Sequence, residues 1–498
     1  MRSFLEAAFL RSGGAPFLHF RGRQWSYADT AAITDSIAAE LIALGVRAGD
    51  RLAMQLPTGP EHLFLWLATA KAGIVSCPLH TDLARPELEA ALAHLAPRSF
   101  IGASRQLTIG GRDVVSLSEL IASRRALIGL EPPKPEAIAT ILTTSGTTGR
   151  PKAAMLSHRM ALLTGEGFAH WLALTPADRL FTCLPLSHVN ARFYSTLGAL
   201  AAGASLALEE RFSASRFWSW VRAAGATEVN AIGAMLKILL DRAPDEAEGA
   251  PTLRLVYTAP ALGRDAHLEF ERRFQARLVI GYGSTECTFG FIHPLDGPRD
   301  LDAMGKPRRH PDPSVPAEVR LVDGEVWLRN PATFSGYFQD DATTRDTVAD
   351  DGWLKTGDLA TLGSDGSYTF TGRKKLVIRR RGEMIAPGEV EAALEAHPAV
   401  LEAGVVGVPS PLGEDDVMAY VALRPGMRAT EAELAAHCAA RLAAFKVPSR
   451  WRFLDALPRT TTQRIACPLS PYFKRSSTTS RPCARSTSSM HSGGAMKR

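Results

Sequence analysis

The sequence predicts an α/β protein with a large N-terminal unit, in which parallel-rich sheets are layered with helices, and a small α+β module at the C-terminus. Up to about residue 374, short apolar segments alternate with amphipathic helical segments, a pattern typical of parallel sheets. From about residue 376 the elements become shorter and more mixed. A length of 498 residues, with 46% hydrophobic and 22% charged residues, is ordinary for a soluble protein of at least two domains.

The individual elements follow from periodicity, because short apolar runs between turn residues indicate buried strands and helical spacing of apolar residues indicates helices. In the large unit we expect strands at 51–56, 99–101, 139–143, 205–208 and 278–281. In the module we expect strands at 377–379, 400–408 and 417–423 and helices at 388–396 and 431–442. The expected boundaries are 1–374 for the large unit, 375–466 for the module and 467–498 for a tail.

The tail differs in composition from the rest of the chain. It is rich in serine, contains no acidic residue and cannot bury enough apolar surface to fold, so we expect it to be disordered. Its abrupt onset is typical of a frameshifted end, with a natural linker as the alternative. The basic residues of the tail account for the whole net charge of +6, so the remainder is electrically balanced. Nucleic acid is therefore not an expected partner.

Cysteine usage and hydropathy favour a cytoplasmic protein. The six cysteines form no C-x-x-C pair, so neither a zinc site nor a disulfide framework is predicted. Glu6 interrupts the first apolar run, which leaves no signal-peptide core. The longest weakly polar run, 197–208, is too short to span a bilayer. We expect no membrane span, and the oligomeric state is left open, with a homodimer as one option.

The most informative segment is the string TTSGTTGRPK at 143–152. Its hydroxyls, glycines and terminal lysine suit a loop that wraps a polyphosphate with hydroxyl, backbone N–H and ammonium donors. The common P-loop pattern does not fit, because the glycines are too close together and Pro151 precedes Lys152. The apolar flanks predict that the loop joins two strands. The expected phosphate contacts are Thr144, Ser145, Gly146, Thr147, Thr148, Gly149 and Lys152.

This string resembles the signature loop of the adenylate-forming enzymes, the superfamily of acyl-CoA synthetases, peptide-synthetase adenylation domains and luciferases. The resemblance extends to about residue 466 and includes GYGSTE at 281–286, WLKTGDL at 353–359 and GRKK at 372–375, in the family's order. It implies the acetyl-CoA synthetase-like fold and ATP-dependent activation of a carboxylic acid. Such chemistry relies on positioning and charge stabilisation around the α-phosphate.

The resemblance assigns roles to the GYGSTE motif. Tyr282 is expected to pack on adenine, with Gly283 beside it, and the hydroxyl of Thr285 is expected to meet phosphate. Glu286 is expected to hold Mg²⁺, a hard cation that suits carboxylate oxygen. The alternative for this segment alone is an ordinary glycine-rich turn with one exposed acid.

Three further nucleotide contacts are implied by the resemblance. Asp358 would accept hydrogen bonds from the ribose hydroxyls, and Arg373 would add a second nucleotide contact. Ala259 belongs to a segment that resembles the adenine-contacting turn, although Thr258 stands where relatives tend to have glycine.

Two segments resemble the walls of an acyl pocket. In 184–190, His188 is expected near the entering carboxylate or thiol, with a satisfied core histidine as the alternative. In 230–235, Gly233 would leave room for the substrate, and the alternative for its apolar neighbours is plain core. The expected pocket residues are Asn190, Ile232, Gly233 and Met235.

The resemblance also implies a mobile C-terminal module. Lys375 occupies the hinge position, at which a small backbone change swings the module between an adenylating and a thioester-forming pose. Arg381 and Gly382 belong to the loop that would line the pantetheine tunnel, where positive charge suits the phosphates of CoA. The alternative for the arginines at 379–381 is a solvated strand edge.

One expected catalytic residue departs from the family pattern. Most relatives carry a lysine in a motif like P-R-T-x-x-G-K, whereas this chain has Gln463 and Arg464 in place of the last two residues. Arginine keeps the charge but is planar and longer, so the exchange is not conservative at a point-charge site. Leu376 and Glu383 also differ from the usual residues beside the hinge.

The sequence therefore predicts an ATP-dependent acyl-CoA ligase that uses ATP, Mg²⁺ and coenzyme A. The acid would be adenylated and then transferred to the CoA thiol. Details of several motifs look most like ligases for carnitine or crotonobetaine. Two alternatives are left open: an adenylation enzyme that loads a carrier protein, and a nucleotide-binding homologue with impaired catalysis. Pyrophosphate and thioester measurements separate them.

Overall fold

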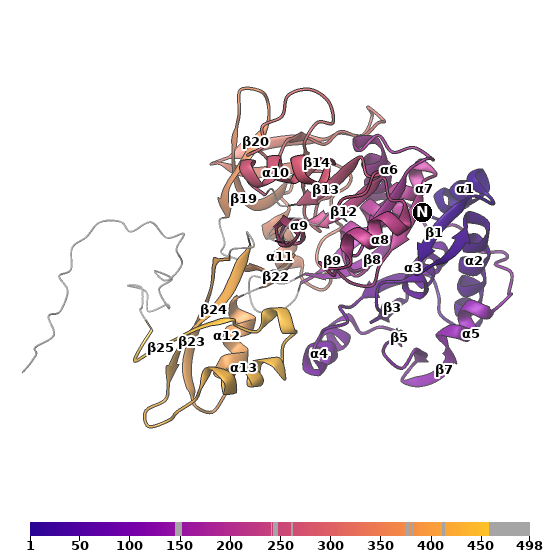
Figure 1. Cartoon of the computed structure of the whole chain (residues 1–498). Coiled ribbons are helices and arrows are strands. Elements are labelled where there is room, and N and C mark those ends of the chain that lie inside the picture. The colour runs from indigo at the N-terminus through magenta and orange to yellow at the C-terminus, as the bar shows by residue number, and fades with distance from the viewer. Residues whose placement is uncertain are drawn as a thin grey trace, which may run out of the picture.

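The computed structural model describes residues 1–144, 152–240, 242, 248–259, 262–373, 378–380, 382–385, 387–410 and 414–457. Figure 1 shows a large N-terminal unit and, as a lobe beside it in orange and yellow, the C-terminal module. The predicted tail at 467–498 lies outside the described residues. Among the helices that are described, none is long and apolar enough to cross a membrane.

Two large sheets form the N-terminal unit, and each combines central parallel strands with antiparallel edges. All five strands expected in this unit are present. The first sheet, in the order β7-β6-β5-β3-β4-β8-β9, contains β3 (Arg51–Met54), β4 (Val75–Pro78), β5 (Ser99–Ile101), β6 (Gln106–Ile109), β7 (Arg112–Ser116), β8 (Ile138–Thr144) and β9 (Lys152–Ser157). The second, in the order β16-β15-β14-β13-β12-β10-β11-β1-β2, contains β1 (Pro16–Phe20), β2 (Arg23–Ser26), β10 (Arg179–Thr182), β11 (Ser205–Leu208), β12 (Glu228–Ile232), β13 (Leu255–Ala259), β14 (Arg277–Tyr282), β15 (Phe291–Ile292) and β16 (Lys306–Pro307).

Helices pack with these sheets around one large hydrophobic core. The helix α3 (Pro60–Ala72) is buried from His62 to Ala72, as expected for a helix that is apolar on nearly every side. A π-helical stretch, η1 (Asn190–Leu197), is also buried and packs against α6 (His158–Trp171). The other helices of the unit are α1 (Arg2–Ser12), α2 (Tyr27–Ala43), α4 (Arg85–Leu95), α5 (Leu117–Ala122), α7 (Gly198–Ala202), α8 (Phe217–Ala224), α9 (Gly233–Leu240), α10 (Arg264–Phe274) and α11 (Asp341–Thr347).

A four-stranded antiparallel sheet follows, which the sequence pattern did not predict as a separate layer. Its short strands alternate in hydropathy much like edge strands of a mixed sheet, so periodicity alone does not distinguish the two arrangements. The strands are β17 (Glu318–Val322), β18 (Glu325–Arg329), β19 (Leu354–Leu362) and β20 (Tyr368–Arg373). This sheet carries Asp358 on β19, opposite Arg373 on β20.

The C-terminal module has its own hydrophobic cluster, separate from the large core. The predicted elements are present with shifted ends; for example, α13 ends at Ala439, three residues before the expected end. The elements are the hairpin β21 (Ile378–Arg380) and β22 (Glu383–Ile385), the sheet β23 (Val400–Pro409), β24 (Asp415–Leu423) and β25 (Arg450–Leu454), the helices α12 (Pro387–Glu395) and α13 (Glu431–Ala439), and a short 3-10 turn, Ala444–Lys446.

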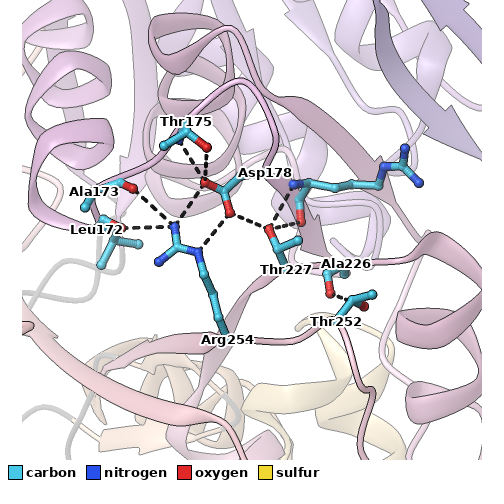
Figure 2. A network of polar contacts seen from close by, with 9 residues as sticks. Leu172, Ala173, Thr175, Asp178, Ala226, Thr227, Thr252 and Arg254 are labelled. Atoms are coloured by element: carbon cyan, nitrogen blue, oxygen red, sulfur yellow. Dashed lines mark hydrogen bonds and ion pairs between the residues drawn. The ribbon is translucent and has the colours of Figure 1, made fainter.

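A polar network ties together the amino ends of β10, β12 and β13 (Figure 2). The buried carboxylate of Asp178 accepts hydrogen bonds from Nε of Arg254 at 2.9 Å, Oγ1 of Thr227 at 2.7 Å and the backbone N–H of Thr175 at 2.8 Å. Burial would raise the pKa of Asp178, but these donors outweigh burial and lower it. Arg254 also donates to the carbonyl of Leu172 at 3.1 Å. The network therefore fixes three strands relative to one another.

Glu228, the first residue of β12, lies close to this network and is fully buried. Neither of its carboxylate oxygens has a hydrogen-bond partner among the described residues. Burial raises the pKa of Glu228 well above its ordinary value; the positive charge of Arg254 opposes this rise and the negative charge of Asp178 adds to it. The folded chain therefore keeps a proton on Glu228 under conditions in which the unfolded chain has lost it.

We predict that Glu228→Gln stabilises the protein, and more so at high pH. Because the folded carboxyl has the raised pKa, the wild-type loses stability as pH rises above the pKa of the unfolded residue, and glutamine removes this dependence. Thermal midpoints of both proteins at about pH 5 and about pH 8.5 measure the effect. The exposed Glu131→Gln serves as the control. A gain that is the same at both pH values contradicts the prediction.

Candidate active site

The sequence motifs meet at the carboxyl ends of parallel strands, where open α/β sheets bind their ligands. Ile232 ends β12, Ala259 ends β13 and Tyr282 ends β14. Ile232 and Ala259 are paired across neighbouring strands. The predicted phosphate loop joins the antiparallel strands β8 and β9, as expected. The fold thus brings the segments that contain Ile232, Ala259 and Tyr282 together at the carboxyl ends of neighbouring strands of the second sheet.

The GYGSTE and WLKTGDL motifs are in direct contact. The hydroxyl of Tyr282 donates a hydrogen bond to Oδ2 of Asp358 at 2.7 Å. Asp358 is only 5% exposed, and its backbone N–H donates to the hydroxyl of Thr356 at 3.1 Å. The aromatic ring expected beside adenine and the carboxylate expected at the ribose are therefore neighbours.

Tyr337 connects the two expected phosphate-binding segments, and the sequence analysis missed it. Its hydroxyl donates to Oε1 of Glu286 at 2.8 Å, and Nζ of Lys152 lies 4.7 Å from the centre of its ring. Burial, with the negative charge of Glu286 next, raises the pKa of Tyr337, which keeps the hydroxyl protonated as a donor. An ammonium and a carboxylate thus lie around one buried phenol, one above its ring and one at its hydroxyl.

The backbone around Tyr337 explains its placement. The residue bridges to Ala154 on β9, and the N–H of Phe338 donates to the carbonyl of Ala153 at 2.7 Å. Gly336 has a φ of +104°, and a Cβ there would lie 2.9 Å from Cγ2 of Thr344, so only glycine fits the turn. The signal available in the sequence was the SGYF string at 335–338, which has no distinctive chemistry on its own.

The expected acyl-pocket residues lie in three elements, η1, β12 and α9. Asn190 begins the π-helical stretch η1, and Oδ1 of this residue is buried without a hydrogen-bond partner among the described residues. Ile232 ends β12, whereas Gly233 and Met235 begin α9 and are buried. Asn230 links β12 to η1, because its Nδ2 donates to Oγ of Ser195 at 2.7 Å. The two predicted walls are therefore in contact.

Gly382 lies against this pocket wall. A Cβ on Gly382 would lie 2.6 Å from Cδ1 of Ile232, and its φ is +79°, so both space and backbone conformation require glycine. The backbone N–H of Gly382 donates to both carboxylate oxygens of Glu414, at 3.1 and 3.0 Å. The sequence placed Gly382 with the cofactor contacts; the structure brings it next to an expected acyl-pocket residue.

His188 also meets the C-terminal module. Its Nε2 lies 2.9 Å from Oε1 of Glu383, and Nε2 of His80 lies 3.6 Å from the same oxygen. Burial opposes a charge on His188, but the carboxylate of Glu383 outweighs burial and raises the pKa of His188. Burial likewise opposes a charge on Glu383, and the charge of His188 outweighs it and lowers the pKa of Glu383. Burial lowers the pKa of His80.

A second contact between the two units involves a buried lysine. Nζ of Lys446 lies 3.0 Å from Oε1 of Glu87 in the large unit and 3.0 Å from Oε2 of Glu389 in the module. Burial opposes the charge on Lys446, but Glu389 and Glu87 outweigh it and raise the pKa. The neighbouring Phe445 packs edge-on against His80, with ring centres 5.7 Å apart. The sequence analysis assigned no role to these residues.

Some expected site residues cannot be placed. Ser145, Gly146, Thr147, Thr148 and Gly149 of the loop, together with Lys375, Arg381 and Arg464, lie outside the described residues. For Thr144 and Arg373 the strand is described but the side chain is not. Gly283 is exposed and Thr285 half-buried at the turn between Tyr282 and Glu286.

Comparison with known proteins assigns the chain to a family. The family model described as AMP-binding enzyme matches residues 5–338, and the model described as AMP-binding enzyme C-terminal domain matches residues 389–464. A sulfoacetate–CoA ligase of Cupriavidus necator is 32% identical over 471 residues, which cover 89% of this chain and 91% of the relative. A crotonobetaine/carnitine–CoA ligase of Salmonella typhimurium is 28% identical over 485 residues, which cover 89% of this chain and 92% of the relative.

Two solved structures of o-succinylbenzoate CoA synthetase from Bacillus subtilis resemble the chain to different degrees. The double mutant bound with the product analogue OSB-NCoA has a TM-score of 0.83 at 25% identity, covering 94% of this chain and 97% of that chain. The complex with AMP has a TM-score of 0.68 at 26% identity; it covers 93% of this chain and 97% of that chain. The family models together match most of the chain, and the chain belongs to the AMP-binding enzyme family.

Proposed function

We propose that the protein is an ATP-dependent acid–thiol ligase that joins a carboxylic acid to AMP and then transfers the acyl group to the thiol of coenzyme A. The observations that carry this proposal are the convergence of Lys152 and Glu286 on Tyr337 and the hydrogen bond between Tyr282 and Asp358. A cation and a carboxylate suit the phosphates and their Mg²⁺, an aromatic ring suits adenine, and a buried carboxylate suits the ribose hydroxyls. The names of the matched CoA ligases support the same reaction.

In the first step a carboxylate oxygen of the acid attacks the α-phosphorus of ATP, and pyrophosphate leaves. Lys152 would balance charge on the departing phosphates, since an ammonium at that position favours the developing anion. Asp358 would accept the ribose hydroxyls, and the ring of Tyr282 would flank adenine. Because these groups hold the nucleotide from both ends, the α-phosphate is positioned for in-line attack.

Glu286 is the proposed Mg²⁺ ligand. The half-buried carboxylate keeps oxygen atoms that suit a hard cation, and the hydrogen bond from Tyr337 fixes its orientation. A bound Mg²⁺ would supply charge neutralisation at the phosphate oxygens. Thr285, the neighbouring residue, would add a hydroxyl to the phosphate contacts.

We further propose that the arrangement of the two units is the thioester-forming one. Gly382 and Glu383 of the module lie against Ile232 and His188, and this supports a module docked over the expected acyl-pocket residues. The stronger likeness to the structure with a product analogue of CoA than to the AMP complex of the same enzyme supports this assignment. Lys375, at the expected hinge, would allow the module to rotate between the two half-reactions.

An acid panel tests the proposed function. The relatives are named for sulfoacetate and for crotonobetaine or carnitine, so the panel includes carboxylic acids with a second anionic or cationic group as well as simple fatty acids. We predict ATP-dependent pyrophosphate release with at least one acid and, when CoA is added, the corresponding thioester by mass spectrometry. Release without thioester indicates carrier loading, and no release with any acid indicates a binding protein; either result refutes the ligase assignment.

The magnesium role predicts the effect of Glu286→Gln. The neutral amide loses charge at the proposed cation site, so we expect pyrophosphate release to fall by about 100-fold, as when one group that stabilises transition-state charge is removed. The Mg²⁺ concentration for the half-maximal rate is expected to rise. Tyr337→Phe removes only a hydrogen bond to the carboxylate and is expected to cost less. If Glu286→Gln leaves the Mg²⁺ dependence unchanged, Glu286 is not the metal ligand.

The docked arrangement predicts a selective effect of Gly382→Ala. A methyl group would collide with Ile232, so CoA-thioester formation from a preformed acyl-adenylate is expected to fall by roughly tenfold, while adenylation is retained. Gly426→Ala is the matched control, because Gly426 has the same φ of +79° but nothing within 4 Å. Ile232→Ala in the Gly382→Ala background is expected to restore part of the rate. An equal loss in both half-reactions contradicts the assignment.

A further inference from the structure

Three side chains from distant parts of the chain share one position between the two units. His80 follows β4, His188 precedes η1, and Glu383 begins β22 in the C-terminal module. Their nearest nitrogen and oxygen atoms all lie within 4.8 Å of one another. The three side chains are 19%, 40% and 18% exposed, respectively, so the cluster is half-buried. Neither His80 nor its contact with Glu383 has a role in the proposed ligase reaction.

Two imidazoles and a carboxylate are typical ligands of a transition metal, but the hydrogen bonding favours a different arrangement. The backbone N–H of Asp82 points at Nδ1 of His80, 3.2 Å away. That nitrogen is therefore the acceptor of the neutral ring, so Nε2 carries the hydrogen and faces Glu383 as a donor. A ring whose Nε2 bears a proton does not ligate a metal through that atom. Glu383 instead accepts a hydrogen bond from Nε2 of His188 at 2.9 Å, and the protonated Nε2 of His80 lies 3.6 Å from the same oxygen.

The two ring nitrogens of His188 differ in their contacts. Nε2 is occupied by Glu383, whereas Nδ1 has no hydrogen-bond partner among the described residues. The Gly382–Glu383 turn touches His188 on one side and Ile232 of the acyl-pocket wall on the other. Nδ1 of His188 is therefore an available proton acceptor, on a residue that shares this turn with the expected acyl-pocket wall. A carboxylate on one nitrogen and an open position on the other form the arrangement of a general base.

We propose that His188 is the general base for the CoA thiol and that Glu383 and His80 are the residues that position it. The inference rests on the proposed ligase function. In the step, the thiol proton moves to Nδ1 of His188 and the sulfur electron pair forms a bond to the carbonyl carbon of the acyl-adenylate. The bond from that carbon to the AMP oxygen breaks, and AMP leaves with the electron pair. The imidazolium that results is stabilised by the carboxylate of Glu383.

This base is complete only when the module is docked, because Glu383 belongs to the module and both histidines belong to the large unit. During adenylation a strong base beside the acid has no proton to remove. In the thioester step the base has the thiol proton to remove, and the docked module supplies the carboxylate that stabilises the protonated base. The charged and titratable groups that face the His188–Glu383 pair are His80, Asp82, Arg192 and Lys446. Lys446 is itself paired with Glu87 and Glu389, so its charge is balanced.

The test separates the half-reactions in the full-length enzyme with the best acid from the panel. Adenylation is followed by pyrophosphate release, and the thioester step by single-turnover reaction of preformed acyl-adenylate with CoA. We expect His188→Ala to slow the thioester step by about 100-fold near neutral pH, the usual contribution of a general base. Glu383→Gln and His80→Asn are expected to slow the same step by roughly tenfold while pyrophosphate release is retained. The exposed His170→Asn is the control.

The pH profile distinguishes a base from a structural residue. In the wild-type, the thioester rate rises as His188 loses its proton and then levels off. Glu383→Gln removes the stabilising carboxylate, so the inflection moves to lower pH. In His188→Ala the inflection disappears, and the rate approaches that of wild-type at high pH, where the thiol ionises by itself.

Two results overturn the proposal. One is a His188→Ala deficit that stays constant with pH, which shows a structural role. The other is a Glu383→Gln or His80→Asn variant in which the rate of pyrophosphate release falls by the same factor as the rate of the thioester step. Absence of thioester from the wild-type enzyme is a different result, because it refutes the ligase function and not the assignment of the base.

Discussion

The parallel register of β10, β12 and β13 is the constraint on which the site depends. Each strand is preceded by one member of the Asp178–Thr227–Arg254 network, so a single buried carboxylate fixes their amino ends. Because parallel strands rise equally per residue, fixing one end also fixes the other. Ile232 and Ala259 consequently leave the sheet side by side.

The second determinant is the contact between the two units. Three residues of the module contact the large unit. Gly382 has no room for a side chain, Glu383 lies between two imidazoles, and Lys446 lies between two carboxylates. Charges buried at such a contact are tolerated only when each has a partner, so the arrangement is specific. The same residues bring new chemistry to the pocket wall. Docking and catalysis of the thioester step are, in this interpretation, one event.

The candidate site was predictable from sequence to the extent that its residues lie in contiguous strings. The segment at 143–152 carries an unusual combination of hydroxyls and glycines that predicts a polyphosphate loop, and the resemblance of 281–286 and 353–359 to adenylate-forming enzymes predicts the nucleotide. Tyr337 and His80 were missed, because each is a single ordinary residue whose partner is distant in the chain. The separate antiparallel sheet from β17 to β20 was missed because its strands have the period of any half-buried strand.

The sequence by itself determined the α/β class, the order of the motifs and the chemical nature of the ligand, since residue type and local spacing set hydropathy, turn formation and donor chemistry. The tertiary structure alone decided which of these groups meet. It paired Tyr282 with Asp358, enclosed Tyr337 between Lys152 and Glu286, and brought Glu383 to His188. Such contacts depend on strand register and on how two separately folded units pack, and neither is encoded in any local stretch of residues.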